Sequence, residues 1–147
     1  MKNILFVCTG NSCRSQMAEG FGKSLSNGRF VISSAGTCPI GIHPMTIQTM
    51  KEAGIDISDQ KSTMLDKKMM AKCDYFVTLC GSAKDSCPAP PAGVKHIHWD
   101  IENPDILYTS EESRRKGFAR IRDEIKRRVE NLLIQIDWDE VRFISQK

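Results

Sequence analysis

The sequence predicts an α/β fold in which a four-stranded parallel sheet has helices on both faces. Two observations support this prediction. Short apolar runs, typical of buried strands, recur along the chain. They alternate with segments whose apolar residues are three or four positions apart, which is the spacing of amphipathic helices. Strands that alternate with helices form parallel βαβ units, and such a sheet is covered on both faces.

In the first half of the chain, the sequence predicts two strands, each followed by a helix. The run 2–7 is largely apolar and leads into a loop, and the helix predicted over 16–25 has apolar residues four positions apart. The second strand is predicted over 30–34, where valine and isoleucine follow a phenylalanine. The second helix, over 45–53, has Pro44 at its start and a glycine after its end, which are favoured positions for both residue types.

The second half predicts a weaker helix, two strands and one long helix. The weaker helix covers 64–71, and the strands cover 75–79 and 94–99. Apolar residues step by three and four positions over 111–136, which predicts a long amphipathic helix. Residues 137–147 form a tail with alternating apolar residues, to which the pattern assigns no structure.

Length and composition indicate a single domain spanning residues 1–147. A chain of 147 residues buries a core of ordinary size, and 40% hydrophobic with 27% charged residues is typical of folded proteins. The formal net charge of +3 does not indicate nucleic-acid binding, and acidic residues interrupt the basic stretches of the long helix. No apolar stretch approaches the roughly 20 residues that span a bilayer, so no membrane partner is expected. We expect a monomer.

Six cysteines are the unusual feature of the composition. An even number invites a disulfide framework, but the apolar run near the start of the chain is too short for a signal peptide. We therefore expect a cytoplasmic protein whose thiols are reduced and serve as metal ligands, catalytic groups or core residues. The six are Cys8, Cys13, Cys38, Cys73, Cys80 and Cys87.

The loop between the first strand and the first helix has the features of an oxyanion site. It lies beyond the carboxyl end of a parallel strand and precedes a helix N-terminus with free N–H groups. Gly10 and Asn11 tolerate the left-handed conformation that a curled loop requires. Successive N–H groups of such a loop can point at one centre and hold a tetrahedral anion. The predicted substrate-binding residues are Thr9, Gly10, Asn11, Ser12, Cys13, Arg14 and Ser15.

Cys8 and Arg14 predict the chemistry of this loop. The guanidinium of Arg14 presents a planar fork of donors that matches two oxygens of an anion. The helix N-terminus and the arginine both favour the thiolate form of Cys8, which can then attack the central atom of the anion. The alternative is a core cysteine followed by an ordinary turn. A Walker A motif is excluded, because no Gly-Lys-Ser/Thr is present.

Cys80 and Cys87 form a second pair of thiols. Cys80 follows the third strand, so we expect it near Cys8 if the first and third strands are neighbours. In a helical segment Cys80 and Cys87 would lie about 10 Å apart, whereas a disulfide needs Cα atoms within about 7 Å. A disulfide between them therefore requires the segment to unwind, and two small buried side chains are the alternative.

The order strand, Cys-x5-Arg-Ser, helix resembles the phosphate loop of the low-molecular-weight protein tyrosine phosphatases. The addition of Cys80 and Cys87 resembles the thioredoxin-coupled arsenate reductases of that superfamily, and the resemblance covers about residues 2–134. It implies a three-layer fold with a four-stranded parallel sheet and helices on both faces. This fold agrees with the pattern of strands and helices.

The resemblance also implies that arsenate is reduced to arsenite by a relay of three cysteines. Cys8 is the nucleophile, Cys80 attacks the Cys8 sulfur of the arsenic adduct, and Cys87 resolves the product as a Cys80–Cys87 disulfide. Thioredoxin then reduces that disulfide as the electron donor, so no bound cofactor is implied. Phosphate is implied as a competing oxyanion.

The chain departs from the family at the proton donor. The family's general acid is an aspartate before a proline in the loop after the fourth strand, and Asn103 stands at that position here. An amide cannot donate a proton in this role. Asp105 is our candidate general acid because it follows Pro104 in the same loop, and Glu102 is the alternative. The departure weakens a phosphatase more than a reductase, because arsenate exchanges its hydroxyl groups readily.

No metal site is predicted. Some relatives bind potassium beside the loop through Asn, Glu, Ser and Asp side chains, and Thr63 stands at the position of the aspartate. The other three positions are matched by Asn11, Glu19 and Ser34. His96 and His98 share one face of the fourth strand, but no third ligand is spaced with them.

Two other functions are compatible with the sequence. A low-molecular-weight protein tyrosine phosphatase would use Cys8 and Arg14 alone, and residual hydrolysis of aryl phosphates is compatible with either enzyme. A non-catalytic protein would bind oxyanions or sense redox conditions through its thiols. Cys13 belongs to the loop without an assigned step, and Cys38 and Cys73 have no predicted role.

Overall fold

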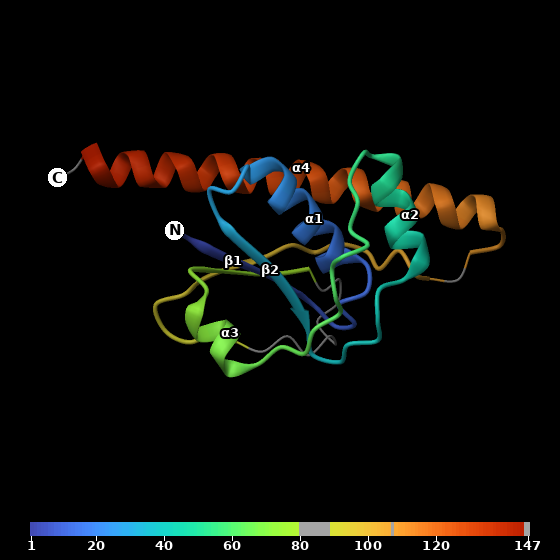
Figure 1. The fold of residues 1–147 in the computed structure, drawn as a ribbon, viewed down its shortest axis with the longest axis horizontal. Helices are drawn as coiled ribbons and strands as arrows, with labels where there is room; N and C mark the ends of the chain where they lie inside the picture. The colour runs from blue at the N-terminus through green and yellow to red at the C-terminus, as the bar shows by residue number, and fades with distance from the viewer. Residues whose placement is uncertain (80–88, 107, 146–147) are drawn as a thin grey trace.

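The computed structural model describes residues 1–79, 89–106 and 108–145 (Figure 1). Within them, the strands are β1 Asn3–Cys8, β2 Val31–Gly36, β3 Tyr75–Thr78 and β4 Lys95–His98. The helices are α1 Arg14–Ser26, α2 Pro44–Glu52, α3 Lys67–Lys72 and α4 Glu111–Ser145. Each of these elements was predicted from the sequence, and the largest differences in their ends occur at α3 and α4.

The described strands form one parallel sheet with the order β2-β1-β3-β4. β1 lies between β2 and β3, and Ile4 of β1 is opposite both Ile32 and Tyr75. The predicted four-stranded parallel α/β fold is therefore confirmed. Because β1 is a central strand, it places Cys8 in the middle of the carboxyl edge of the sheet, where ligands of such sheets bind.

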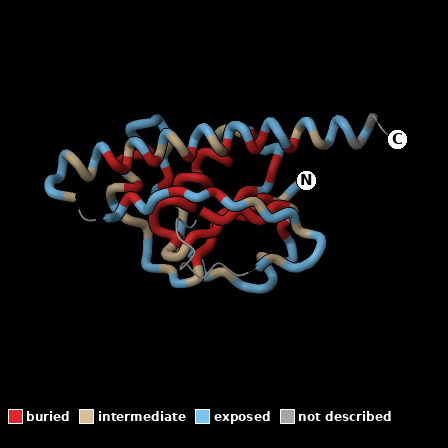
Figure 2. Tube along the Cα trace, turned by 180° about the vertical axis from the view of Figure 1, so that it is seen from behind, coloured by how far each residue is buried: buried red, intermediate tan, exposed pale blue. Residues whose placement is uncertain are grey.

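The helices form two layers, one on each face of the sheet. Figure 1 shows α1, α2 and α4 on one face and α3 on the other. Alternate residues of β1 face the two layers. Ile4 and Phe6 belong to the large core under α1 and α4, whereas Leu5 and Val7 belong to the smaller core beside α3. All four side chains are buried, so β1 is covered on both faces (Figure 2).

α4 continues beyond its predicted end into the segment 137–147, as far as Ser145. Two ion pairs connect this extension to the rest of the protein: Arg29 with Asp137 at 2.7 Å and Lys95 with Asp139 at 3.5 Å. Trp138 and Val141 are exposed, so the one-faced apolar pattern that predicts a core helix ends at about Ile136. Among the described residues, no helix has both the length and the apolarity needed to cross a bilayer.

α3 begins at Lys67, later than the sequence predicts. Asp66 caps it by accepting a hydrogen bond from the N–H of Met69 at 2.8 Å. The residues before this cap pair with the sheet, because the N–H of Leu65 donates to the carbonyl oxygen of Gly36 at 2.9 Å. A helical spacing of apolar residues in this segment was therefore overridden by a backbone contact with β2.

Gly36, at the end of β2, lies where this strand passes closest to the loop after β1. A Cβ atom here would lie 2.6 Å from the carbonyl oxygen of Thr9 and 2.8 Å from the nitrogen of Asn11. Both are backbone atoms of the loop, so no flexible side chain can move aside to make room. The absence of a side chain at Gly36 therefore allows β2 to support the loop.

Replacing Gly36 by alanine is expected to push the loop away from β2 and to destabilise the protein by about 1–3 kcal/mol, the usual cost of overpacking. Ser33→Ala, on the same strand, is the matched control, because Ser33 is only partly buried. Thermal unfolding tests both variants. The midpoint should fall by several degrees for Gly36→Ala alone. Equal midpoints for the two variants would show that the close approach does not require glycine.

Candidate active site

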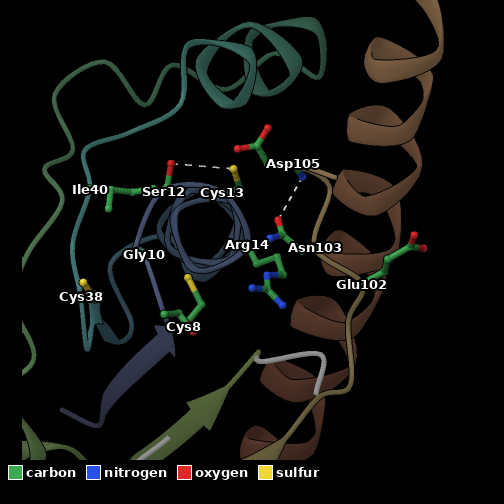
Figure 3. Close-up of a pocket in the computed structure, with 11 residues that line it drawn as sticks. Cys8, Gly10, Ser12, Cys13, Arg14, Cys38, Ile40, Glu102, Asn103 and Asp105 are labelled. Carbon is green, nitrogen blue, oxygen red and sulfur yellow. Dashed lines mark hydrogen bonds between the residues drawn. The ribbon is translucent and has the colours of Figure 1, made fainter. Parts of the chain in front are cut away.

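Cys8 ends the central strand and lines a pocket of about 540 Å³. Its side chain is buried, and its sulfur lies 2.9 Å from the hydroxyl oxygen of Ser15. α1 begins at Arg14, so the free N–H groups and the positive dipole end of this helix face the same pocket. The pocket lies between residues 8–14, residues 38–40 and residues 102–105 (Figure 3).

The loop after Cys8 is curled, with its carbonyl oxygens held on the outside. These oxygens accept hydrogen bonds as follows: Thr9 from the N–H of Cys38 (2.9 Å), Gly10 from the N–H of Ile40 (3.1 Å), Asn11 from Nε2 of Gln16 (3.2 Å), Ser12 from the N–H of His43 (3.2 Å) and Cys13 from the N–H of Met17 (3.0 Å). In a trans peptide the N–H points opposite to the C=O, so the intervening N–H groups face the inside of the loop. Such a ring of N–H groups is suited to a tetrahedral anion.

Asn11 shapes the loop and connects it to β2. Its φ of 46° is left-handed, as the sequence predicts for this position, whereas Gly10 does not adopt a positive φ. Its side-chain amide donates to Oγ of Ser15 at 2.7 Å and to Oγ of Ser34 at 3.0 Å. The hydroxyl of Ser15 accepts from Asn11, so its own hydrogen is available to the sulfur of Cys8. The Ser15 hydroxyl therefore links the side chain of Asn11 to the sulfur of Cys8.

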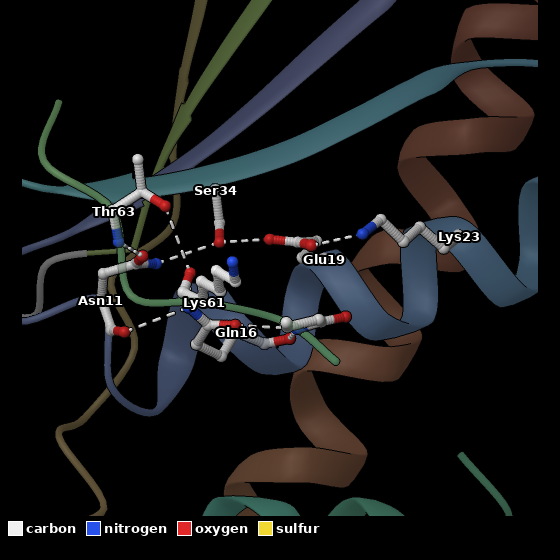
Figure 4. Close-up of polar contacts among 8 residues, drawn as sticks. Asn11, Gln16, Glu19, Lys23, Ser34, Lys61 and Thr63 are labelled. Carbon is white, nitrogen blue, oxygen red and sulfur yellow. Dashed lines mark hydrogen bonds and ion pairs between the residues drawn. The ribbon is translucent and has the colours of Figure 1, made fainter. Parts of the chain in front are cut away.

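The network continues from Ser34 to an ion pair on α1 (Figure 4). Ser34 donates to Oε1 of Glu19 at 2.5 Å, and Nζ of Lys23 lies 2.5 Å from Oε2 of the same carboxylate. Lys23 therefore balances a buried negative charge beside the loop. A potassium ion does not fit here, because an ammonium group already contacts the carboxylate. In addition, the backbone N–H of Thr63 donates to Oδ1 of Asn11 at 2.8 Å, so this side-chain oxygen already accepts a hydrogen bond.

Arg14 is buried, and its guanidinium lies beside Cys8 in the pocket (Figure 3). Its Nη1 donates to the carbonyl oxygen of Ile101 at 3.0 Å, which fixes the guanidinium to the loop after β4. A guanidinium has five N–H donors, so others can bind an anion. An oxyanion in the loop can therefore contact backbone N–H groups and the fork of Arg14 together.

The loop after β4 contains both candidate proton donors, and their surroundings differ. The side chain of Glu102 points away from the pocket toward α4, and its carboxylate lies 3.1 Å from Nη2 of Arg120 (Figure 3). Oδ1 of Asp105 lies 3.4 Å from Nε2 of His43 at the pocket wall. Asn103 accepts a hydrogen bond from the N–H of Asp105 at 3.0 Å. The geometry favours Asp105 over Glu102 as a donor to a bound anion.

Cys13 lines the same pocket as Cys8 but has a different environment. Burial raises the pKa of the Cys13 thiol to about 11, and the negative charge of Asp105 adds to the rise. Hydrogen bonds with Thr46 and Ser12 act in the opposite direction and are weaker. A thiol with this pKa is protonated at neutral pH and is a poor nucleophile. Cys13 is therefore a packing residue of the loop.

The other predicted thiols are placed as follows. Cys80 and Cys87 lie outside the described residues. Cys73 is buried in the smaller core, in agreement with its lack of a predicted role. Cys38, also without a predicted role, is exposed and lines the pocket together with Ile40. Sequence reasoning missed these two residues, although their position just after β2, at the carboxyl edge of the sheet, is a signal that could have identified them.

His96 and His98 both contact one hydroxyl group. Nε2 of His96 lies 3.1 Å and Nδ1 of His98 lies 2.6 Å from Oγ1 of Thr78. Within the part of the chain that the structure describes, no three His, Cys, Asp or Glu side chains gather in a group that could hold a metal ion. The two imidazoles therefore serve as partners of the Thr78 hydroxyl in this structure.

Known proteins resemble this chain in sequence and in fold. A curated arsenate reductase of Halalkalibacterium halodurans is 45% identical over 128 residues, which are 87% of this chain and 92% of that protein. A solved arsenate reductase in the phosphate binding state has 38% identity and a TM-score of 0.79, with 92% of this chain and 99% of that chain covered. The thioredoxin-dependent arsenate reductase of Corynebacterium glutamicum has 26% identity and a TM-score of 0.77, with 95% of this chain and 63% of that chain covered.

The family model for the low molecular weight phosphotyrosine protein phosphatases matches residues 3–142. This match includes the sheet, the loop between β1 and α1, and nearly all of α4. The curled loop with Cys8 at its start and Arg14 at its end agrees with the phosphate loop that the sequence resemblance implies. From the extent of the match and the geometry of the loop together, we conclude that the chain belongs to the low molecular weight phosphotyrosine protein phosphatase family.

Proposed function

We propose that the protein reduces arsenate to arsenite and is recycled by thioredoxin. The observation that carries the proposal is that Cys8 lies at the start of a curled loop, with its sulfur 2.9 Å from the Ser15 hydroxyl oxygen, in a chain whose sequence has two further cysteines after β3. The arsenate reductase of Halalkalibacterium halodurans and the thioredoxin-dependent reductase of Corynebacterium glutamicum support it, because both resemble this chain over most of its length.

Arsenate is bound by geometry and charge. The inward N–H groups of the loop and the guanidinium of Arg14 together surround the oxygens of a tetrahedral anion. The positive end of α1 adds to the attraction. Phosphate has the same shape, and we propose it as a competing ligand. The solved relative in the phosphate binding state supports this part of the proposal.

The first step forms a bond between sulfur and arsenic. The thiolate of Cys8 attacks the arsenic atom, and one arsenate oxygen leaves as water after it accepts a proton. We assign this proton to Asp105, because its carboxyl group lies at the pocket wall while Glu102 pairs with Arg120. Arsenic is still pentavalent in the adduct, so no electrons have yet been transferred.

The second and third steps transfer the electrons. The thiolate of Cys80 attacks the sulfur of Cys8, and arsenic leaves as arsenite with the electron pair of the S–As bond. Arsenic is thereby reduced, and the two sulfur atoms are oxidised to a Cys8–Cys80 disulfide. The thiolate of Cys87 then attacks Cys80, which releases Cys8 as a thiolate and forms a Cys80–Cys87 disulfide. Thioredoxin reduces this disulfide by the same exchange chemistry.

The strand order supports the approach of the first two thiols. β1 and β3 are neighbours, and the N–H of Leu79 donates to the carbonyl oxygen of Val7 at 2.8 Å. Val7 and Leu79 directly precede Cys8 and Cys80 in the sequence. The two cysteines therefore follow paired backbone positions at one edge of the sheet.

The relay has consequences for cofactor, location and assembly. The electrons come from the dithiol of thioredoxin, so we propose that the protein holds no cofactor. Thiols are kept reduced in the cytoplasm, which is where we propose that the protein acts. All the proposed relay thiols belong to one chain, so we propose that the monomer is active.

The relay predicts where single cysteine variants stop. Wild-type protein with arsenate should accumulate a Cys80–Cys87 disulfide and turn over when thioredoxin is present. Cys87→Ser should release one arsenite per chain and stop as Cys8–Cys80, whereas the control Cys73→Ser should behave as wild type. Arsenite assays and disulfide mapping by mass spectrometry measure these outcomes. A Cys80→Ser variant that turns over normally with thioredoxin contradicts the relay.

The assignment of the proton donor predicts unequal effects of two conservative variants. Asp105→Asn should lower the rate of arsenite formation about 10- to 100-fold, because a positioned general acid is lost. Glu102→Gln is the matched control and should retain the wild-type rate within about twofold, since Glu102 faces Arg120. The measurement is the rate at saturating arsenate with thioredoxin in excess. Equal rates for the two variants would remove Asp105 from the mechanism.

The raised pKa of Cys13 predicts selective alkylation. At pH 7 the Cys13 thiol is protonated, because its pKa of about 11 lies well above this pH, so iodoacetamide should modify Cys8 and spare Cys13. Modification of Cys13 should increase only as the pH rises toward about 11. Peptide mass spectrometry measures both sites, and inorganic phosphate should protect Cys8. Rapid modification of Cys13 at pH 7 would contradict its assignment as an inert thiol.

A further inference from the structure

His43 connects the oxyanion loop to α2. It is the N-cap of α2, where its Nδ1 accepts a hydrogen bond from the N–H of Met45 at 3.0 Å. The backbone N–H of His43 donates to the carbonyl oxygen of Ser12 at 3.2 Å. Its ring packs against Phe118, with the ring centroids 5.2 Å apart. These contacts fix both the position and the orientation of the imidazole.

The contact with Met45 also determines which ring nitrogen carries the proton. Because Nδ1 accepts a hydrogen bond, the proton of the neutral ring belongs on Nε2. Nε2 lies 3.4 Å from Oδ1 of Asp105. The free N–H of the imidazole therefore faces the carboxyl group that we assign as the proton donor. A contact of this length can shorten to a hydrogen bond when substrate binds.

Capping of α2 does not by itself account for a histidine at position 43. Asparagine, aspartate, serine and threonine are the preferred N-cap residues, because their short side chains reach the N–H groups of the first turn. A histidine adds a second nitrogen on the far side of its ring. In this structure that second nitrogen contacts Asp105. The choice of histidine is explained if this contact has a function of its own.

We propose that His43 is the positioning residue of the proton donor, an inference that rests on the assignment of Asp105 in the proposed function. The Nε2–H of His43 is directed at Oδ1 of Asp105 and makes this oxygen a hydrogen-bond acceptor, which favours the acid proton on the other oxygen. The transferable proton therefore belongs on Oδ2. It passes from Oδ2 to the departing arsenate oxygen, which leaves as water, and Asp105 remains as a carboxylate that is still held by His43.

The backbone of Asp105 is held separately from its side chain. Its N–H donates to Oδ1 of Asn103 at 3.0 Å, while its carboxyl group contacts His43. Asn103 therefore orients the backbone, and His43 orients the carboxyl group. A residue that acts through another in this way should change the rate of the chemical step without weakening the binding of arsenate.

Two variants of His43 separate the helix cap from the contact with Asp105. His43→Asn keeps a cap, since asparagine is a preferred N-cap residue, but its short side chain carries no group at the position of Nε2. His43→Ala removes the cap and the contact together. Each is combined with Asp105→Asn, and wild type, single and double variants are compared by steady-state kcat and KM for arsenate with thioredoxin in excess, and by thermal unfolding.

The proposal predicts that His43→Asn lowers kcat by about 10-fold or more, with unchanged KM for arsenate and an unchanged unfolding midpoint. His43→Ala should lower both kcat and the midpoint. In the Asp105→Asn background, His43→Asn should cause no further loss, because the group that it positions is already gone. A purely structural role would instead lower the rate by the same factor in both backgrounds.

Three results would overturn the proposal, and they differ in what else they affect. If His43→Asn has a normal kcat while Asp105→Asn is slow, His43 does not position the proton donor, but Asp105 keeps its assignment as that donor. Equal losses from His43→Asn in both backgrounds show that it acts independently of Asp105. If Asp105→Asn has a normal kcat, neither the assignment of Asp105 as the proton donor nor that of His43 as its positioning residue holds. Arsenate reduction itself is tested separately, by arsenite formation in the wild-type protein.

Discussion

The hydrogen bonds that hold the loop carbonyls outward are the constraint on which the rest of the site depends. A carbonyl that turned inward would present its negative end to an anion, whereas the bonds seen here leave the N–H groups facing the centre. Their donors come from α1 and from the segment 38–43 after β2. The connection between β2 and α2 therefore helps to shape the anion site. Gly36 lets this connection approach the loop closely enough to form these bonds.

A second requirement is that the charges around the loop are balanced. Glu19 is buried next to a loop built for anions, and an uncompensated carboxylate there would oppose anion binding. Lys23 lies one helical turn later on α1 and contacts this carboxylate, in the favourable order of glutamate before lysine. Glu19 is thereby free to accept from Ser34 and to orient the network that reaches Cys8 through Asn11 and Ser15. One helix thus supplies the positive dipole end and neutralises its own buried acid.

The sequence predicted those parts of the site that depend on neighbours in the chain. The strand, the loop from Cys8 to Arg14 and the following helix are contiguous, so their spacing alone indicated an anion site. The pairing of His43 with Asp105 joins residues 62 positions apart and carries no local signal. The same reason explains the start of α3, where Leu65 pairs with Gly36, and the extension of α4, where Asp137 pairs with Arg29. Each of these features is decided by a tertiary contact that periodicity does not show.

The thiols also show why spacing alone does not assign a chemical role. Cys8 and Cys13 belong to one loop and line one pocket, yet Cys8 lies at the end of a strand within reach of the Ser15 hydroxyl. Burial raises the pKa of Cys13 to about 11, so its thiol stays protonated beside the nucleophile. A second thiolate in this pocket would repel the oxyanion and compete for the arsenic atom. In the mechanism that we propose, a neutral Cys13 thereby leaves Cys8 as the single attacking sulfur of the loop.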